Sequence, residues 1–318
     1  MSLRQEMLQA ARSSRILLRD AGRVERFLRG RMNSDGGFAD RSGKSDLYYT
    51  VFGLEALLAL GAGVQRPAVE SYLRGFGAGE SLDLVHLSCL ARCWADLDSC
   101  RPQACLPAGG RQASSSLGAP GESSSAPLPM RQEILRRVET FGSADGGYNQ
   151  VASSRCGTAY GCFLAFGAYE DLEGRMPDAG GLVRCLESLK VGDGAYVNAP
   201  GLPIGSTPTT AEAVALLRRL GRSIDPASVR WLLARCCEGG GFLAVPGAPT
   251  ADLLSTATAL HALAGAGTPL GEIRRPCLDF VNALWCEAGG FRGNLFDETP
   301  DCEYTWYGLL ALGNLAGP

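Results

Sequence analysis

Asp35-Gly36-Gly37-Phe38 is the stretch that decides the fold, because close variants of it return along the chain. The other copies are Asp145-Gly146-Gly147-Tyr148, Asp193-Gly194-Ala195-Tyr196, Gly240-Gly241-Phe242 and Gly289-Gly290-Phe291. The last four follow one another at intervals of 48, 46 and 49 residues, and an apolar stretch of helical character follows each turn. Repeats of this length are typical of stacked supersecondary units.

Working outward from these turns, the chain divides into six units that each read as helix, Gly-rich turn and helix. The units cover 24–63, 67–97, 131–172, 180–222, 227–267 and 272–315. Second helices such as 49–58 are apolar on nearly all sides, whereas first helices such as 24–29 are amphipathic, which indicates one buried and one half-exposed layer. We therefore predict an all-α fold: an α/α toroid of six helical hairpins, with an inner six-helix barrel inside an outer one.

The repeats predict one domain over residues 1–318. Between the second and third units, residues 99–130 are rich in Pro, Gly, Ser and Ala and carry almost no apolar periodicity. We predict a flexible surface insertion for this segment.

Composition excludes several classes of partner. The net charge is −3 and no dense run of Lys or Arg occurs, so nucleic acid is not an expected partner. No run of 18 apolar residues predicts a membrane span, and residues 1–20 lack the apolar core of a signal peptide. The twelve cysteines form no Cys-x-x-Cys pair and read as reduced thiols at helix interfaces, so we expect a cytoplasmic protein.

Two segments carry a resemblance to a known family. The run 36–50, with Asp40-Arg41, Gly43 and Asp46-Leu47-Tyr48-Tyr49-Thr50, is similar to the final repeat of protein farnesyl- and geranylgeranyltransferase β-subunits. The run 289–306, with Gly289-Gly290 and Asp301-Cys302-Glu303-Tyr304-Thr305-Trp306, resembles their penultimate repeat. More broadly, the chain resembles the prenyltransferase/squalene-cyclase repeat family.

The two segments stand in rotated order, last and first instead of second to last and last. In a closed ring the sixth and first units are neighbours, so the same two hairpins would still lie side by side. We therefore expect a circularly permuted toroid.

The resemblance implies transfer of an isoprenoid group from its diphosphate to an acceptor thiol with the help of zinc. Asp301 matches the zinc-binding Asp of the family. Glu303 stands at the Cys position, with Cys302 one residue before it, and Tyr49 stands at the His position. Oxygen donors of this kind favour Mg²⁺, so Zn²⁺ and Mg²⁺ both stay open.

A second metal set is also open. Asp46 and His86 have the family's Asp and His spacing, but in the first and second units, with Tyr48 in place of the Cys. His86 equally reads as a hydrogen-bonded histidine near a helix start, and His261 reads as structural.

The resemblance implies a diphosphate site in the same region. Tyr304 matches the family's diphosphate-binding Tyr and joins Asp301 and Tyr49 as a candidate catalytic residue. Asn294 stands in place of an Arg, and acidic Asp297 and Glu298 lie near the place of a Lys. The cations expected to compensate are Arg41, Lys44 and Arg292.

An aromatic set is expected on the inner helices, facing a central cavity. Its members are Tyr48, Tyr49, Phe52, Tyr160, Phe163, Trp306 and Tyr307. Such a pocket would suit an isoprenoid chain or another apolar ligand, or a carbocation.

Three functions follow from these residues. The first is a prenyltransferase-like protein that binds an isoprenoid diphosphate and transfers it. The second is a terpene cyclase-like enzyme, for which Asp96-Leu97-Asp98-Ser99 is the nearest acid motif. The third is a non-catalytic toroid that binds a lipid or a protein. The β-subunits of the family pair with a helical α-subunit, so a protein partner is possible.

Overall fold

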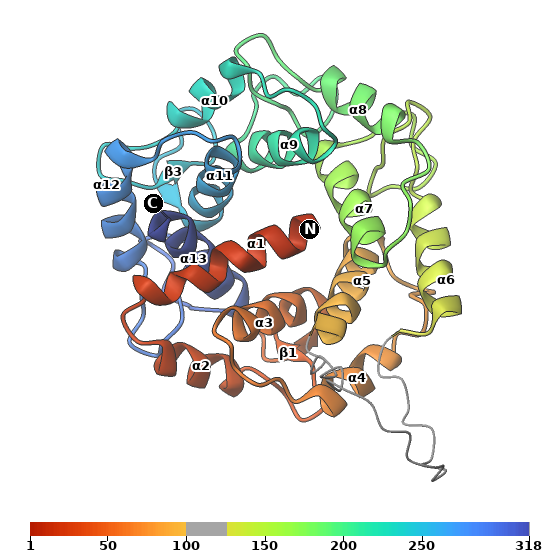
Figure 1. The fold of residues 1–318 in the computed structure, drawn as a ribbon, viewed down its shortest axis with the longest axis horizontal. Coiled ribbons are helices and arrows are strands. Elements are labelled where there is room, and N and C mark those ends of the chain that lie inside the picture. The colour runs from red at the N-terminus through yellow and green to blue at the C-terminus, as the bar shows by residue number, and fades with distance from the viewer. Residues whose placement is uncertain (100–125, 318) are drawn as a thin grey trace, which may run out of the picture.

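The chain forms a ring of helices in two concentric layers (Figure 1), seen in a computed structural model that describes residues 1–99 and 126–317. The inner helices are α3 (Leu47–Ala59), α5 (Leu84–Ser99), α7 (Ala159–Asp171), α9 (Thr207–Arg219), α11 (Leu253–Gly265) and α13 (Cys302–Ala316). The outer helices are α2 (Ala21–Gly30), α4 (Arg66–Arg74), α6 (Leu128–Glu139), α8 (Ala179–Ser188), α10 (Pro226–Leu233) and α12 (Gly271–Ala283). The predicted α/α toroid is confirmed.

The predicted insertion 99–130 is too long at both ends. Ser99 is the last residue of α5, and α6 already begins at Leu128 because Pro127 and Pro129 suit a helix start. Residues 100–125 lie outside the described part of the chain.

A repeated hydrogen bond ties each Gly-Gly turn to its inner helix. The N–H of the turn aromatic donates to a side chain on the first turn of that helix. The pairs are Phe38 with Thr50 (2.9 Å), Tyr148 with Cys162 (3.4 Å), Tyr196 with Thr210 (3.0 Å), Phe242 with Thr256 (2.9 Å) and Phe291 with Thr305 (3.2 Å). Five of the six inner helices therefore share one register relative to their turns.

The turn glycines are required by close packing as well as by backbone angle. Gly240 has φ +84°, and a Cβ there would lie 2.0 Å from the carbonyl oxygen of Pro276 on α12. Gly289 has φ +102°, and its Cβ would lie 2.4 Å from the carbonyl oxygen of Arg23 on α2. Each of these two turns packs directly against the backbone of the outer helix in the next unit, so there is no room for a side chain at the glycine.

Short strands, which an all-α prediction does not include, lead from two of the turns to their inner helices. β1 (Phe38–Ala39) pairs antiparallel with β2 (Ser45–Asp46), so that Phe38 lies opposite Asp46. β3 (Phe242–Leu243) pairs in the same way with β4 (Ala251–Asp252). Each strand has two residues, so the helical class is unchanged.

The ring closes between the sixth and first units. Helix α13 packs against α3 (Figure 1), and Gly289 of the sixth unit lies against α2 of the first. The adjacency that a permuted toroid requires is therefore present.

An additional helix, α1 (Leu3–Arg12), crosses one end of the inner barrel and continues into the 3₁₀ turn η1 (Ser13–Ile16) (Figure 1). Its Arg4 donates to Asp96 of α5 (2.7 Å) and to Asp171 of α7 (3.0 Å), and all three side chains are buried. Leu3 and Met7 face the barrel interior. The helix α1 thus forms a floor at the carboxyl ends of the inner helices.

Within the described ranges, no helix combines the length and the apolar character needed to cross a membrane.

Candidate functional site

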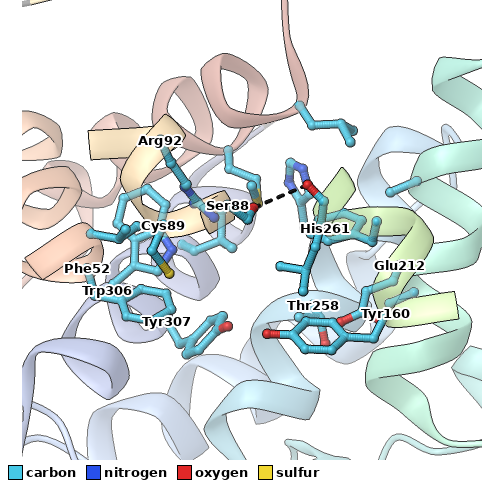
Figure 2. A pocket seen from close by; sticks show the side chains of 18 of the residues that line it. Phe52, Ser88, Cys89, Arg92, Tyr160, Glu212, Thr258, His261, Trp306 and Tyr307 are labelled. Atoms are coloured by element: carbon cyan, nitrogen blue, oxygen red, sulfur yellow. Dashed lines mark hydrogen bonds between the residues drawn. The ribbon is translucent and has the colours of Figure 1, made fainter. Parts of the chain in front are cut away.

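The barrel encloses a lumen whose walls come from all six inner helices and whose floor comes from α1 (Figure 2). It holds about 880 Å³ of empty space including its open mouth, of which about 100 Å³ admits the centre of a water molecule. Six of the seven predicted aromatic residues line it, namely Tyr48, Phe52, Tyr160, Phe163, Trp306 and Tyr307. The lumen is therefore narrow, aromatic and open at the amino ends of the inner helices.

The shared register of the inner helices explains which side chains face inward. The residue two places after the turn-binding Thr or Cys points into the lumen in five units. These residues are Phe52, Leu164, Glu212, Thr258 and Tyr307. Four of the five are the apolar or neutral residues expected in such a wall, and Glu212 is the exception.

Glu212 is a functional candidate that the sequence pattern does not predict. Its carboxyl group lines the lumen and makes no hydrogen bond or ion pair with any described residue. Burial raises the pKa of Glu212 to about 8, so the side chain is mostly protonated at pH 7. Its place two residues after Thr210 marks it as lumenal once the hydrogen bonds from the turns define the common register.

His261 lies in the same wall, rather than in a purely structural position. Asn314 donates its amide to the Leu310 carbonyl (2.8 Å), so its oxygen faces His261 Nδ1 at 3.4 Å. This arrangement places the imidazole proton on Nδ1, and burial lowers the pKa of His261. The buried Nε2 has no partner among the described residues and is left as an acceptor.

A cation of the lumen wall is neutralised in place. Arg92 on α5 donates from Nε and Nη2 to both carboxyl oxygens of Glu55 on α3, at 2.5 and 2.6 Å. Glu55 is fully buried. This pair joins two inner helices and adds no net charge to the lumen.

At the mouth, Arg41 bridges the first and sixth units. Its Nε donates to Asp301 (2.7 Å) and its Nη2 to Asp297 (2.7 Å), while its guanidinium carbon lies 5.5 Å from the centre of the Tyr304 ring. Burial opposes ionisation of Asp297, yet the hydrogen bonds from Arg41 hold its pKa below the ordinary value. Of the three predicted phosphate-binding cations, Arg41 is the one that reaches the mouth. Its positive charge is already neutralised by two carboxylates.

The other two predicted cations lie elsewhere. Arg292 donates to the backbone carbonyls of Asp297 (3.5 Å) and Ala283 (3.3 Å), which fixes the loop before α13. Lys44 is exposed in the turn between β1 and β2. Neither residue lines the lumen.

Glu303 and Tyr48 also close the ring at the mouth. The Tyr48 hydroxyl donates to Glu303 Oε1 at 2.7 Å, and burial raises the pKa of Glu303 to about 7. Tyr49 stacks edge-on against Tyr48 with 5.8 Å between ring centres, and it does not line the lumen. The sequence predicts Glu303 and Tyr49 beside Asp301 in one metal set and Tyr48 with Asp46 and His86 in the other, whereas the structure joins Tyr48 to Glu303.

The predicted zinc set does not fit the geometry. Cys302 is buried in the core. It stands one residue before the family's Cys position, and a shift of one residue at a helix start turns a side chain by about 100°, here away from the mouth. Asp301 caps α13 by accepting from the Tyr304 N–H (2.8 Å) and also accepts from Arg41. Across residues 1–99 and 126–317, no three His, Cys, Asp or Glu side chains are placed to hold a metal ion.

The alternative metal pair is brought together, but outside the lumen. His86 Nε2 lies 4.0 Å from Asp46 Oδ2, and Nδ1 lies 2.8 Å from Asp83. Asp46 caps α3 by accepting from the N–H groups of Tyr48 and Tyr49. The predicted hydrogen-bonded histidine near a helix start describes His86 better than a metal ligand does.

The acid motif expected of a cyclase is occupied by ion pairs. Asp96 accepts from Arg4, and Asp98 accepts from Arg131 at 2.5 Å. Both carboxylates lie toward the floor side of the ring and serve the packing of α1 and α6.

Six helical hairpins that close a ring around one apolar lumen define an α/α toroid. The chain belongs to the prenyltransferase alpha-alpha toroid domain family, whose model matches residues 6–92 and 210–315, more than half of the chain.

Solved structures share the fold at low identity. A Candida albicans protein geranylgeranyltransferase-I in complex with GGPP has a TM-score of 0.64 and 13% identity, covering 94% of this chain and 91% of that one. A type II terpene cyclase from Scytonema in complex with geranylgeranyl dihydroxybenzoate has a TM-score of 0.59 and 13% identity, covering 99% and 98%. An α-1,6-mannanase from Salegentibacter, with a TM-score of 0.57 and 14% identity, covers 93% and 98%. Comparison with curated proteins gives no match.

Proposed function

We propose that this protein binds an isoprenoid chain in the lumen of the toroid. The observation that carries the proposal is a single-ended lumen with aromatic walls, floored by the apolar side chains Leu3 and Met7 of α1. Similar toroids bind GGPP and geranylgeranyl dihydroxybenzoate, which are ligands with long isoprenoid chains. Aromatic, apolar walls around a narrow cavity favour such chains.

Charge at the mouth favours a ligand without a diphosphate. Arg41 is held by Asp297 and Asp301, and Arg92 is held by Glu55, so neither is left to bind a phosphate. The residues present also do not fit zinc. The residues therefore support binding of the isoprenoid chain more strongly than they support diphosphate binding or metal-assisted transfer to a thiol, the two activities that the resemblance implies.

The predicted cytoplasmic location agrees with the cysteines. All ten in the described part of the chain are free thiols, as expected in a reducing compartment.

Titration of the purified protein with farnesol, farnesyl diphosphate and geranylgeranyl diphosphate tests the proposal. Quenching of tryptophan fluorescence reports binding, because Trp306 lines the lumen. We expect saturable farnesol binding that does not depend on Mg²⁺ or Zn²⁺. A diphosphate that binds more tightly than farnesol in the presence of either metal would restore the transferase interpretation.

A lumen-filling variant supplies the structural control. Ala215→Phe places a ring in the lumen wall and should abolish binding, whereas Ala179→Phe, at an exposed position of α8, should not. Circular dichroism verifies that both variants fold. Failure of farnesol and both diphosphates to bind, or wild-type binding by a folded Ala215→Phe protein, would contradict the proposal.

A further inference from the structure

The carboxyl group of Glu212, which has no partner in the part of the chain that the structure describes, lies in a lumen that otherwise suits an uncharged chain. We propose that the ligand of this lumen is an organic cation, in which a positively charged nitrogen on an apolar chain lies beside Glu212. This inference rests on the proposed function, since it gives the charge of the chain that the lumen binds.

No cation among the described residues is available to Glu212. The titratable or charged side chains that line the lumen with it are Tyr48 (α3), Cys89 and Arg92 (α5), Tyr160 (α7), His261 (α11) and Tyr307 (α13), with Glu303 (α13) above at the mouth. Arg92 is bound through two hydrogen bonds to Glu55. At the far end of α9, Arg218 is paired with Glu6 of α1. The helix α1 contributes apolar Leu3 and Met7 to the floor.

The walls beside Glu212 suit positive charge. Tyr160 lies beside Glu212, and Tyr307 lies farther across the same lumen (Figure 2). Phe52 lies 5.6 Å from Tyr307 between ring centres. The faces of such rings attract a cation, most strongly where water is excluded. A carboxylate and several aromatic faces around one cavity are the groups that a quaternary or protonated nitrogen requires.

The route into the lumen carries the same sign of charge. Glu303 stands at the mouth with the Tyr48 hydroxyl as its hydrogen-bond partner. Asp46 and Asp301 cap α3 and α13 beside it. Arg41 is the cation at this mouth, and its two partners Asp297 and Asp301 outnumber it, so the group remains net negative. Carboxyl groups along the entrance raise the local concentration of a cationic ligand and lower that of an anionic one.

Proton release distinguishes this arrangement from simple apolar binding. Glu212 has a pKa of about 8 and is mostly protonated at pH 7 before binding. A cation beside it favours the ionised carboxylate, so binding should release nearly one proton and should strengthen as the pH rises toward 8.

Calorimetric titration with decyltrimethylammonium and with decanol, in two buffers of different ionisation enthalpy, tests the inference. The ammonium probe itself does not titrate. We expect it to bind at least tenfold more tightly than decanol at pH 7 and to release nearly one proton. Between pH 6.5 and 8.5 its affinity should rise by more than about tenfold, as release of nearly one proton requires, while that of decanol should stay constant.

Substitutions test whether Glu212 causes the tighter binding of the ammonium probe and the proton release. Glu212→Gln should weaken ammonium binding at least tenfold, abolish the proton release and leave decanol binding unchanged. Glu272→Gln, an exposed change of the same charge on the outer helix α12, should alter neither. Glu303→Gln separates the contribution of the second carboxyl, whose pKa is about 7.

The outcomes separate the two proposals. Saturable decanol binding with equal affinity for the ammonium probe, or with unchanged ammonium binding by Glu212→Gln, would overturn the cation inference and leave chain binding intact. Absence of binding by both probes would count against the proposed function itself. If the Glu212→Gln protein does not fold, the wild-type protein still tests the inference. Ammonium binding without proton release and without pH dependence would overturn it.

Discussion

At the scale of single residues, Glu212 makes the stability of the protein depend on pH in an unusual direction. Its folded pKa of about 8 lies above the ordinary value of 4.5. The unfolded chain therefore releases this proton first, and the contribution of Glu212 to stability falls as the pH rises from 4.5 to 8.

We expect Glu212→Gln to be more stable than the wild type at pH 9 and close to it at pH 5. A shift of one pKa unit corresponds to about 1.4 kcal/mol, which predicts roughly 2–4 kcal/mol at pH 9 after allowance for partial solvation. Urea unfolding at both pH values measures the difference. A constant difference between the two proteins from pH 5 to pH 9 would contradict the assignment.

Residue identities at the mouth were predicted better than their roles. Asp46 and Asp301 were expected as metal ligands, and they instead cap α3 and α13. An Asp at a helix start serves either purpose, and the choice depends on whether a partner such as Cys302 faces the same cavity. Glu212 was missed because the prediction followed the Gly-Gly turns, and the register that exposes it becomes visible only with the turn-to-threonine hydrogen bonds.

At the scale of elements, α1 depends on a buried ion triad. Arg4 lies between Asp96 and Asp171, and its side chain is 6% exposed. The sequence did not reveal this helix as part of the barrel, because its charged residues resemble those of a solvated terminus. Only the contacts of Arg4, Leu3 and Leu8 with the ring show that it is held in place.

Arg4→Met should release α1 from the floor of the lumen. Loss of one partner from a buried ion pair costs about 3–5 kcal/mol, because the remaining charges stay buried. Hydrogen exchange should show reduced protection of α1 ahead of the inner helices, whereas Arg12→Met, at an exposed position of α1, should not change it. Unaltered protection of α1 in Arg4→Met would mean that apolar contacts alone hold the helix.

The Gly-Gly turns allow a second test among elements. Gly240 and Gly247 have similar positive φ angles, +84° and +77°, but only Gly240 faces a close neighbour, the Pro276 carbonyl. Gly247→Ala should cost about 1–2 kcal/mol for the left-handed backbone alone. Gly240→Ala adds the clash with α12 and should cost roughly 3–5 kcal/mol in total. Thermal unfolding compares the two, and equal costs would show that α12 moves aside freely.

At the scale of the whole molecule, the ring has no terminal repeat. Every hairpin packs on two neighbours, and α13 on α3 closes the circle. The period and the alternation of buried and half-exposed helices were enough to predict this architecture, because the turn occurs five times and the alternation occurs in six units. The prediction that the sixth and first units are neighbours rested on two short segments, and only the observed contacts between α13 and α3 confirm it.

We expect unfolding to be a single cooperative transition. Open repeat arrays unfold from their ends, and a closed ring offers no such end. Trp94 on α5 and Trp231 on α10 lie in the second and fifth units, so variants that retain one or the other report on different parts of the ring. Their melting curves should coincide with circular dichroism, and separate midpoints would reveal independent parts.

The common direction of the inner helices has a further electrostatic consequence. All six begin at the mouth and end at the floor, so their macrodipoles add instead of cancelling, each equivalent to about half a positive charge at the amino end and half a negative charge at the carboxyl end. The caps Asp46, Asp252 and Asp301 offset the positive ends, and Arg4 lies among the negative ones. The barrel therefore carries an axial field that draws positive charge inward from the mouth, toward the depth at which Glu212 stands.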